Sequence, residues 1–570
     1  MVPLMSDSLT VAGKDVGSGN PGVGIINAIT GKLRLAARAL RRVFRRAFAT
    51  ILNQDDILHW PRVYTTDWQA WLKRLGVRQA PQLNSVQIES GFQKIVARYE
   101  NVPEDRTLYP LGITNDGCQP YLGFLILHAV GDGSVTLEDV VGFHESIRAK
   151  DLHGFQMGIS YLNQPSWQQH FPKALQDDTS WNGLLDWLAL EYCLPGYSSN
   201  NLPRPEWPEI NQAARVQVVG HFGYPSGLEV AARAVVKSLE ACGIPVGQRQ
   251  ISASPKDPPR EMKYRSLVKS DKSIVVMSPE PYFANWADRA GVHVPMGHST
   301  KAVWYWELEE VPLHWRELAS VAHEIWAPTT FIQHALARVV AVPVVSMLPA
   351  VTLSEFTPLD RNHFGLARVG FFFLFIFDLA SIMERKNPLG LIRAFKMAFP
   401  NQEDAWLVLK ITRAEKYPAD MNRIRAEAND PRIILIQEDM PREKLLALMN
   451  LCDVYVSLHR SEGFGLTMAE AMLLGKPVIA TAYSGNMDFM DEKTALLVPY
   501  KRVELDRDYP PYRRGNHWAQ PDEVAAATFM RRLWQNPDEA RALGEAGRHK
   551  ASVLLSLEEA GRRMMNRLQT

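Results

Sequence analysis

Two glutamates that stand eight residues apart beside a glycine-spaced turn have the chemistry to bind a nucleotide sugar. Glu462 lies in the turn at 461–465, and Glu470 follows in a segment whose apolar residues repeat with helical spacing. The first turn of a helix has free backbone N–H groups and a positive dipole, so it favours an anion such as a diphosphate. A carboxylate beside a phosphate would be repelled unless it had another task, such as accepting hydrogen bonds from ribose or sugar hydroxyls. The alternative is that both glutamates are ordinary turn and helix acids.

The segments around this turn predict a strand–turn–helix–strand unit. The run at 453–458 is β-branched and apolar, which is typical of a buried parallel strand. A helix is expected from Leu466 until Gly475 ends it, and the next strand starts within 476–480. The unit therefore places the glycine turn at the start of the helix.

The stretch 459–486, which reads HRSEGFGLTMAEAMLLGKPVIATAYSGN, resembles the Glu-x7-Glu signature of retaining glycosyltransferases with the GT-B fold, particularly glycosyltransferase family 4. The resemblance implies an α/β protein with two facing Rossmann-like parallel-sheet domains, of which the second binds the nucleotide-sugar donor. It implies transfer of a hexose-type sugar to a glycan or lipid-linked oligosaccharide in cell-surface polysaccharide synthesis. Another GT-B enzyme, such as an epimerase or a phosphorylase, and a non-catalytic GT-B scaffold are the alternatives.

The resemblance also implies roles for individual residues of this chain. Glu470 is expected on the ribose, and Glu462 is the candidate catalytic residue that holds the transferred sugar. The loop at 437–440 is expected at the base, and the loop at 223–227 of the first domain faces the diphosphate and the acceptor. The remaining donor-binding candidates are Gly463, Phe464, Gly465, Leu466, Gln437, Met440, Gly227 and Ser484.

Two adjacent cations, Arg385 and Lys386, follow the first strand of the expected second domain. Arginine can bind a phosphate with its bidentate fork and lysine as a point charge, so the pair suits a phosphate clamp. Lys386 aligns with the lysine of the resembled family, whereas the family's arginine position falls on Ala380 or Ser381. We expect this pair and the turn after Glu462 to stabilise the departing diphosphate without a metal or other cofactor. The alternative is a solvated helix start.

Glu307 is a fourth catalytic candidate, because it follows an expected strand at 302–306. Many enzymes of the resembled family have a histidine and an aspartate here, where this chain has Trp306 and Glu307. Glu307 could orient a hydroxyl, while Trp304 and Trp306 either stack on a sugar ring or belong to the core. His293 is expected in a surface loop rather than in catalysis, and the same holds for His298.

The rest of the sequence predicts four regions. Residues 1–54 are expected to hold a disordered start and a basic amphipathic helix, and residues 55–211 a mostly helical accessory domain. Strands and helices alternate afterwards, which predicts parallel sheets. The N-terminal Rossmann-like domain on the acceptor side is expected at 212–360. The C-terminal one on the donor side, with its C-terminal helices, is expected at 361–570.

Composition limits the partners and the compartment. The net charge of +1 argues against nucleic acid, and the four widely spaced cysteines read as free thiols of a reducing compartment. The most apolar run, at 369–377, is too short to span a bilayer. No signal peptide is recognised in the polar start. The prediction is a cytoplasmic protein, either soluble or peripheral on the inner face of the membrane.

The membrane prediction depends on the segment 32–52. Drawn as a helix, it has an apolar line formed by Leu33, Leu40, Phe44 and Ile51. A separate basic line is formed by Arg34, Arg38, Arg41 and Arg45. A basic amphipathic helix can lie on anionic lipid. The alternative is a surface helix packed on its own protein.

Overall fold

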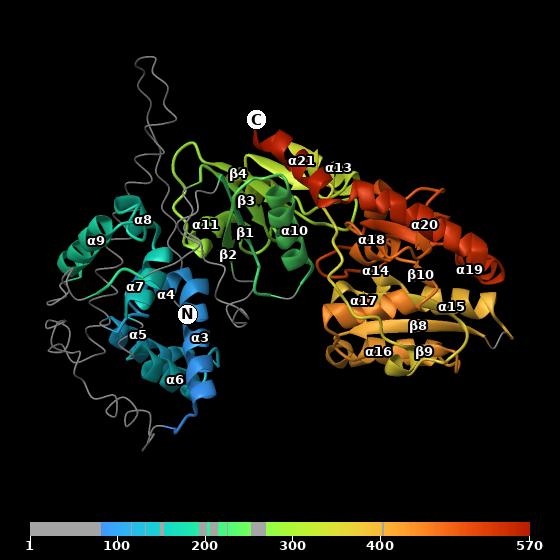
Figure 1. Cartoon of the computed structure of the whole chain (residues 1–570), viewed down its shortest axis with the longest axis horizontal. Coiled ribbons are helices and arrows are strands. Elements are labelled where there is room, and N and C mark those ends of the chain that lie inside the picture. The colour runs from blue at the N-terminus through green and yellow to red at the C-terminus, as the bar shows by residue number, and fades with distance from the viewer. Residues whose placement is uncertain are drawn as a thin grey trace, which may run out of the picture. The chain divides into compact units, whose positions relative to one another are not determined.

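The computed structural model describes residues 81–115, 117–130, 133–148, 153–192, 202–205, 215–224, 226–251, 270–401 and 404–569. The expected disordered start and the basic helix at 32–52 lie outside these residues. The chain divides into two compact units, 1–80 with 188–197 and 81–187 with 198–570. Of the first unit, only 188–192 at the end of helix α9 (Asp178–Glu191) are described. The second unit contains a helical region and two parallel sheets (Figure 1).

The described part of the predicted accessory domain is helical, as expected. Its remaining helices are α3 (Ser85–Asn101), α4 (Pro103–Leu108), α5 (Cys118–Phe124), the π-helix η3 (Leu125–Ala129), α6 (Leu137–Ile147), α7 (His153–Leu162) and α8 (Pro165–His170). Capping boxes start α3 at Asn84 and α6 at Thr136. Glycine lets these two helices approach closely, because a Cβ at Gly91 would lie 2.6 Å from the carbonyl oxygen of Asp139.

The first α/β domain is built on six parallel strands in the order β2-β1-β3-β4-β5-β6. Its strands are β1 (Val216–Gly220), β2 (Val246–Gln250), β3 (Lys272–Val276), β4 (Ser299–Val303), β5 (Glu324–Ala327) and β6 (Val344–Ser346). Its helices are α10 (Gly227–Ala241), α11 (Trp286–Ala290), α12 (Trp315–Leu318) and α13 (Thr330–Ala337). All five residues of β1 are buried, as its apolar run predicts.

The second α/β domain is built on six parallel strands in the order β12-β11-β10-β7-β8-β9. Its strands are β7 (Phe371–Asp378), β8 (Ala405–Thr412), β9 (Ile433–Ile436), β10 (Val454–Ser457), β11 (Val478–Thr481) and β12 (Leu496–Val498). Its helices are α14 (Met383–Lys386), α15 (Pro388–Ala398), α16 (Pro418–Glu427), α17 (Arg442–Leu451) and α18 (Leu466–Leu473). The expected pair of Rossmann-like parallel-sheet domains is thus confirmed.

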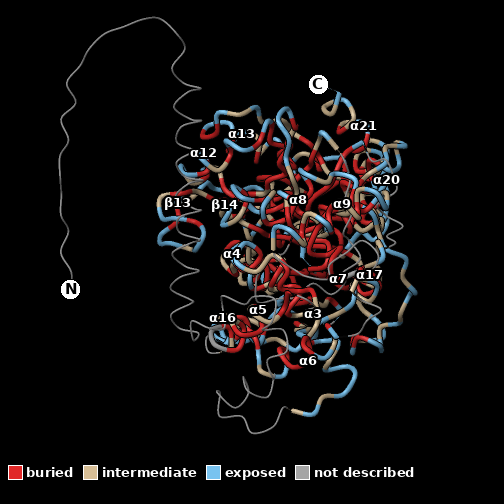
Figure 2. Tube along the Cα trace, turned by 90° about the vertical axis from the view of Figure 1, so that its left-hand side faces the viewer, coloured by how far each residue is buried: buried red, intermediate tan, exposed pale blue. Residues whose placement is uncertain are grey.

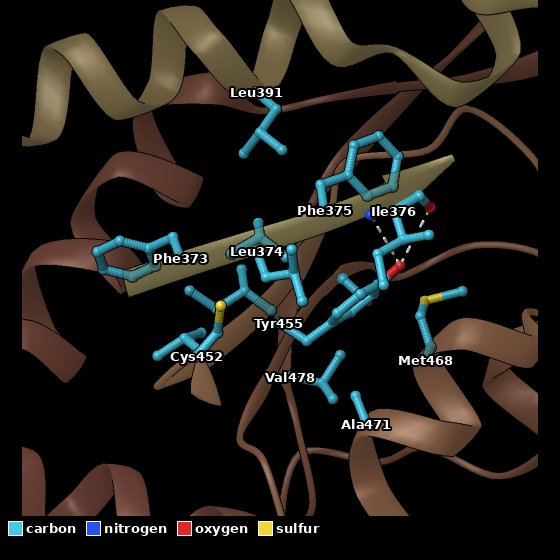
Figure 3. Packing of buried hydrophobic residues seen from close by; sticks show 14 of the residues in the cluster. Phe373, Leu374, Phe375, Ile376, Leu391, Cys452, Tyr455, Met468, Ala471 and Val478 are labelled. Carbon is cyan, nitrogen blue, oxygen red and sulfur yellow. Dashed lines mark hydrogen bonds between the residues drawn. The ribbon is translucent and has the colours of Figure 1, made fainter. Parts of the chain in front are cut away.

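The apolar strand β7 runs through the core of the second domain (Figure 3). Tyr455 on the neighbouring β10 accepts a hydrogen bond from the backbone N–H of Ile376 (3.4 Å) and donates one to Thr467 Oγ1 (2.7 Å). Thr467 lies in the first turn of α18. The buried Tyr455 therefore fixes the start of α18 against β7.

A hairpin that the sequence did not predict follows the second sheet. It comprises the antiparallel strands β13 (Tyr500–Glu504) and β14 (His517–Pro521), and Figure 2 shows β13 with exposed residues. Its inward residues Leu505, Tyr512 and Trp518 belong to the core of the first α/β domain. The hairpin therefore joins the two domains.

The chain ends in the helices α19 (Glu523–Gln535), α20 (Pro537–Leu554) and α21 (Leu557–Leu568), in line with the expected helical tail. Helix α21 returns to the first domain, where it packs on α10. A Cβ at Gly561 would lie 2.1 Å from the carbonyl oxygen of Ser238, so glycine is required for this close approach. Among the helices of the described residues, none combines the length and apolar character needed to cross a bilayer.

Candidate active site

The structure brings three of the four predicted catalytic residues into one buried ionic cluster. Lys386 Nζ donates to Glu462 Oε1, and Arg385 Nη1 lies 3.3 Å from Glu462 Oε2. Arg385 Nη1 also donates to the carbonyl oxygen of Ser461 (2.9 Å). Arginine and lysine therefore hold the turn at 461–465 through its side chain and its backbone.

The charges of this cluster keep Glu462 ionised. Burial by itself would raise the pKa of Glu462, but the charges of Lys386 and Arg385 outweigh it and hold the pKa at about 2. The side chain is therefore a carboxylate near neutral pH. A buried carboxylate of this kind can accept hydrogen bonds from sugar hydroxyls and cannot serve as a proton donor near neutral pH.

Short helix α14 presents the two cations from a strained backbone. Ile382 before it has a φ of 66°, and Asn387 after it has a φ of 55°. Residues other than glycine rarely adopt such backbone angles. Each angle costs about 1–3 kcal/mol and persists only where the surrounding structure holds it. Asn387 is held by donating to the carbonyl oxygen of Leu458 (2.8 Å), and its Oδ1 caps α15 by accepting from Gly390 N (3.3 Å). The turn after β7 is thereby tied to the end of β10.

Glycines allow the turn at 461–465 to pack between two other loops. A Cβ at Gly463 would lie 2.8 Å from the carbonyl oxygen of Trp306, and one at Gly485 would lie 2.0 Å from that of Gly463. Gly465, with a φ of 96°, begins α18, and no side chain caps this helix. The backbone N–H of Glu462 is occupied by Ser484 Oγ (2.8 Å). The N–H groups available to an anion are therefore those of the first turn of α18.

Glu470 has one carboxylate oxygen paired and one unpaired. Its side chain is completely buried, and Oε1 contacts Arg442 Nη2 at the start of α17. Oε2 is buried without a hydrogen-bond partner. A buried carboxylate oxygen that lacks a donor is costly, so Oε2 is the atom of Glu470 with capacity to accept a further hydrogen bond. Sequence reasoning missed Arg442, which no motif marks.

Glu307 reaches the cluster from the first domain. The expected strand at 302–306 is wrong in its position, because β4 ends at Val303 and leaves Glu307 in the loop beyond its carboxyl end. The Glu307 carbonyl oxygen accepts from Ser461 Oγ, and Glu307 Oε2 accepts from the hydroxyl of Tyr512 (2.7 Å). Tyr512 comes from the hairpin and was not anticipated, because a residue pair separated by 205 positions leaves no local signal.

The two tryptophans beside Glu307 are core residues. Trp304 is fully buried, and its ring lies 5.0 Å from that of Phe283. Trp306 is 5% exposed, packs on Tyr512 at 5.2 Å, and donates its indole N–H to the carbonyl oxygen of Glu310 (2.9 Å). Of the two alternatives, the core position is therefore the one that the structure supports.

The expectation that His298 lies at the surface is wrong. His298 is buried, and its Nε2 lies 2.9 Å from Ser273 Oγ near the amino end of β3. That is the opposite end of the strand from the one that faces ligands. His293 is half-buried, and its backbone N–H donates to Gln168 Oε1 (3.4 Å). Neither histidine belongs to the cluster.

The other donor-binding candidates lie in the expected loops. Gln437 is exposed and accepts from Arg425 (2.9 Å), while Met440 packs against the core after β9. Gly227 starts α10 with open space around it. Phe464 packs its ring 5.0 Å from that of Phe489, and Leu466 is half-buried. Among the described contacts, none connects Gln437, Met440 or Gly227 with the Glu462 cluster.

A cavity of about 430 Å³ lies between the two α/β domains and shares only Ser484 with the predicted residues. Ser484 has a φ of 76° and accepts a hydrogen bond from the N–H of Glu462. Other lining residues are Glu309, Phe331, His334, Tyr483 and Asp488. Ser484 therefore lies between this cavity and the ionic cluster.

The second domain matches a known family. Residues 373–550 match the family model described as glycosyl transferases group 1, and this range includes the Arg385, Lys386 and Glu462 cluster. The match covers most of the second α/β domain. Two Rossmann-like domains with a last helix that returns to the first form the GT-B architecture. Among curated proteins, no sequence match is found.

Several solved structures are similar to this chain. Sucrose-phosphate synthase from Thermosynechococcus elongatus is 18% identical over 62% of this chain and 98% of that chain, with a TM-score of 0.47. HepE from Anabaena, solved with UDP and glucose, is 14% identical over 63% of this chain and 100% of that chain (TM-score 0.45). A glycosyltransferase from Rickettsia africae is 13% identical over 63% of this chain and 98% of that chain (TM-score 0.44).

Proposed function

We propose that the protein is a retaining glycosyltransferase of family 4 that transfers a sugar from a nucleotide diphosphate sugar to a glycan or lipid-linked acceptor. Cell-surface polysaccharide synthesis is the proposed setting. The observation that carries the proposal is the buried cluster of Lys386, Arg385 and Glu462 beside the uncapped start of α18. The cluster lies within residues 373–550, which match the family model of glycosyl transferases group 1.

The charges of this cluster assign different tasks to its members. When the bond from the anomeric carbon to the diphosphate breaks, both electrons go to the diphosphate oxygen. The acceptor oxygen forms the new bond to the anomeric carbon, and its proton passes to the departing diphosphate. Lys386 and the N–H groups of α18 would stabilise that charge. Arg385 already donates to Ser461 and Ser381, so its task is to hold the turn. With these groups present, we propose that the diphosphate leaves without the help of a divalent metal.

The two carboxylates would hold the sugar and the acceptor. Glu462 would accept hydrogen bonds from hydroxyls of the transferred sugar, and Glu470 from those of the ribose. Glu307, which enters from the first domain, would orient the acceptor hydroxyl. A non-catalytic scaffold would have no reason to keep a buried carboxylate between two buried cations, so the intact cluster argues against that alternative.

Donor binding tests the proposal and identifies the base. A thermal-shift panel of UDP, GDP, ADP and TDP sugars should show one nucleotide that stabilises the protein, because a ligand of the folded state raises stability by mass action. Calorimetry then measures its Kd. The proposal fails if no sugar nucleotide binds to the folded protein.

Glu470→Gln should weaken donor binding at least tenfold. The substitution preserves the shape of the side chain but removes the charge that would accept the ribose hydroxyls, and hydrogen bonds to charged groups contribute about 1.5–3 kcal/mol. Calorimetry with the nucleotide from the panel measures the change. A folded Glu470→Gln protein with the wild-type Kd would refute the ribose assignment.

Tyr512→Phe should lower turnover up to about tenfold with an unchanged donor Kd, because the lost hydrogen bond to Glu307 is worth about 1.5 kcal/mol. The ring would still pack on Trp306. Tyr509→Phe on the same hairpin is the matched control, since its hydroxyl donates to the exposed Asp506 (3.0 Å). Equal kcat values for Tyr512→Phe and the wild type would remove Tyr512 from its positioning role.

We further propose that the enzyme acts in the cytoplasm and attaches to the inner face of the membrane through the helix predicted at 32–52. Only the sequence pattern of that segment supports this step. Deletion of 1–52 should release the protein from anionic liposomes if the helix is a membrane anchor.

A further inference from the structure

Three buried arginines gather where the helical region contacts the first α/β domain. Arg106 on α4, Arg249 on β2 and Arg289 on α11 are 3%, 2% and 5% exposed. The elements that carry them are labelled in Figure 1. None of the three belongs to the donor site described above, and none was singled out by its sequence.

Their hydrogen bonds place the side chains of Arg106 and Arg249 against the backbone of α11 on either side of Arg289, and the charge of Arg289 is close enough to contribute to lowering the pKa of Arg106. Arg106 donates to the carbonyl oxygen of Asp288, and Arg249 donates to that of Ala290 (2.7 Å). Asp288 and Ala290 are the residues on either side of Arg289. The guanidinium groups of Arg106 and Arg249 therefore approach α11 at the position of Arg289.

The helical region completes the arrangement. Arg106 Nη1 donates to Asn163 Oδ1 (3.4 Å), and Arg249 Nη2 donates to the carbonyl oxygen of Leu162. Both acceptors lie at the end of α7, and a Cβ at the nearby Gly291 would lie 2.6 Å from Asn163 Cα. The arginines are thus enclosed by both parts of the chain.

Much of their hydrogen-bonding capacity is unused. Arg106 Nε, Arg249 Nη1 and two nitrogens of Arg289, Nε and Nη2, are buried without an acceptor. The guanidinium of Arg289 lies over the face of Tyr282, at 3.6 Å from the ring centroid. Among the described residues no carboxylate lies within ion-pair distance of these arginines, although the exposed Glu104 and Asp288 are near enough to favour the charge of Arg106.

Within the described residues, this arrangement lacks a carboxylate in direct contact with the three arginines. Burial lowers the pKa of Arg106 to about 10 and that of Arg249 to about 9, and the charge of Arg106 adds to the effect on Arg249. Both groups nevertheless stay cationic at neutral pH. Buried charges without a partner are costly, so proteins normally pair them. The partner that would balance these charges is an anion.

The cluster lies at the end of the sheet where ligands bind. Arg249 is paired with Val219 near the carboxyl end of β1, and Arg289 is close enough to His221, in the loop after β1, to lower its pKa after the larger effect of burial. Ligands of parallel α/β domains bind beyond this edge. Glu307 follows β4 at the same edge, three strand spacings from β2, or about 14 Å across the sheet.

We propose that Arg106, Arg249 and Arg289 bind an oxyanion, either a phosphate or a carboxylate group, of the acceptor substrate. The acceptor would then be anionic, with its charged group some distance from the hydroxyl that receives the sugar. Guanidinium groups bind such oxyanions with parallel N–H donors. The assignment to the acceptor rests on the proposed function, whereas the anion site itself does not.

Inorganic phosphate, titrated against chloride at equal ionic strength, tests the site in the full-length protein. Phosphate should raise the melting temperature of the wild type, and Arg289→Met should weaken the phosphate Kd at least tenfold. Without phosphate, Arg289→Met should melt at a higher temperature than the wild type, because it removes a buried cation that has no carboxylate partner and breaks no side-chain hydrogen bond among the described residues. With saturating phosphate, the order should reverse.

Lys386→Gln is the control, because phosphate could also bind at the donor site. Phosphate should still raise the melting temperature of Lys386→Gln, whereas it should not raise that of Arg289→Met. An equal phosphate shift in wild type and Arg289→Met, or no shift in the wild type, would overturn the anion site. Neither result depends on glycosyl transfer, so failure of the site and failure of the proposed function are distinguishable.

Acceptor kinetics identify the source of the anion. If the site holds a charged group of the acceptor, phosphate should raise the acceptor KM in the wild type but not in Arg289→Met. It should leave kcat unchanged. An acceptor KM that phosphate does not alter would overturn the assignment to the acceptor.

Discussion

Replacing Glu462 by glutamine should lower kcat by roughly a hundredfold, which is the usual effect of removing one preorganised polar group from an active site. Donor affinity should stay the same or increase. The single negative charge of Glu462 is paired with both Lys386 and Arg385, so its loss makes Lys386 more available to the diphosphate. Turnover assays and calorimetry on the same preparation separate the two effects.

Glu415→Gln, on an exposed segment of the same domain, is the matched control and should behave like the wild type. Unchanged kcat in Glu462→Gln would remove Glu462 from the reaction. A weaker donor Kd with unchanged kcat would instead assign Glu462 to uniform donor binding.

The same substitution should change the pH dependence of stability. The pKa of Glu462 is held at about 2, below the ordinary 4.5. Its contribution to the free energy of unfolding is therefore present above pH 4.5 and is lost as the pH falls through 2. Between these values the wild type should lose more stability than Glu462→Gln, whereas above pH 5 their difference should be constant.

Lys386→Met should lower kcat/KM by roughly a hundred- to a thousandfold, since it removes the most available cation beside the departing diphosphate. The methionine side chain fills a similar volume, so packing is largely preserved. Steady-state kinetics with the nucleotide sugar selected by the panel measure the loss. Lys416→Met, at an exposed position of the same domain, is the control and should retain full activity.

A double-mutant cycle makes this prediction sharper. If Lys386 and Glu462 act as one unit, the double variant Glu462→Gln with Lys386→Met should lose less than the product of the two single losses. Strict additivity would show that the two residues act separately. Wild-type kcat/KM in Lys386→Met would contradict the diphosphate assignment.

The two sheets could be predicted because their strands are continuous apolar runs. The run at 369–377 became β7 and the run at 453–458 became β10, each with small shifts at the ends. The strand before Glu307 ended earlier than expected, because Trp304 and Trp306 have a high strand propensity but pack as core residues beyond β4. Apolar character alone does not distinguish a strand from a buried loop.

The ionic cluster could be predicted in part. Lys386 and Glu462 are 76 residues apart, and each was expected from the sequence to bind a phosphate or a sugar. Their mutual contact could not be predicted, because it depends on the order of the strands. The hairpin that carries Tyr512 was missed for a different reason. Most residues of β13 are exposed, and its few apolar neighbours are buried only against the other domain.

The hairpin and the last helix limit how the protein can be divided. A chimera joined at residue 361 to exchange the second α/β domain would remove Leu505, Tyr512 and Trp518 from the core of the first α/β domain, together with α21. The parent that supplies the first α/β domain should therefore also supply residues 505–518 and 557–568. Chimeras that follow this rule should fold, and those cut once at the linker should precipitate.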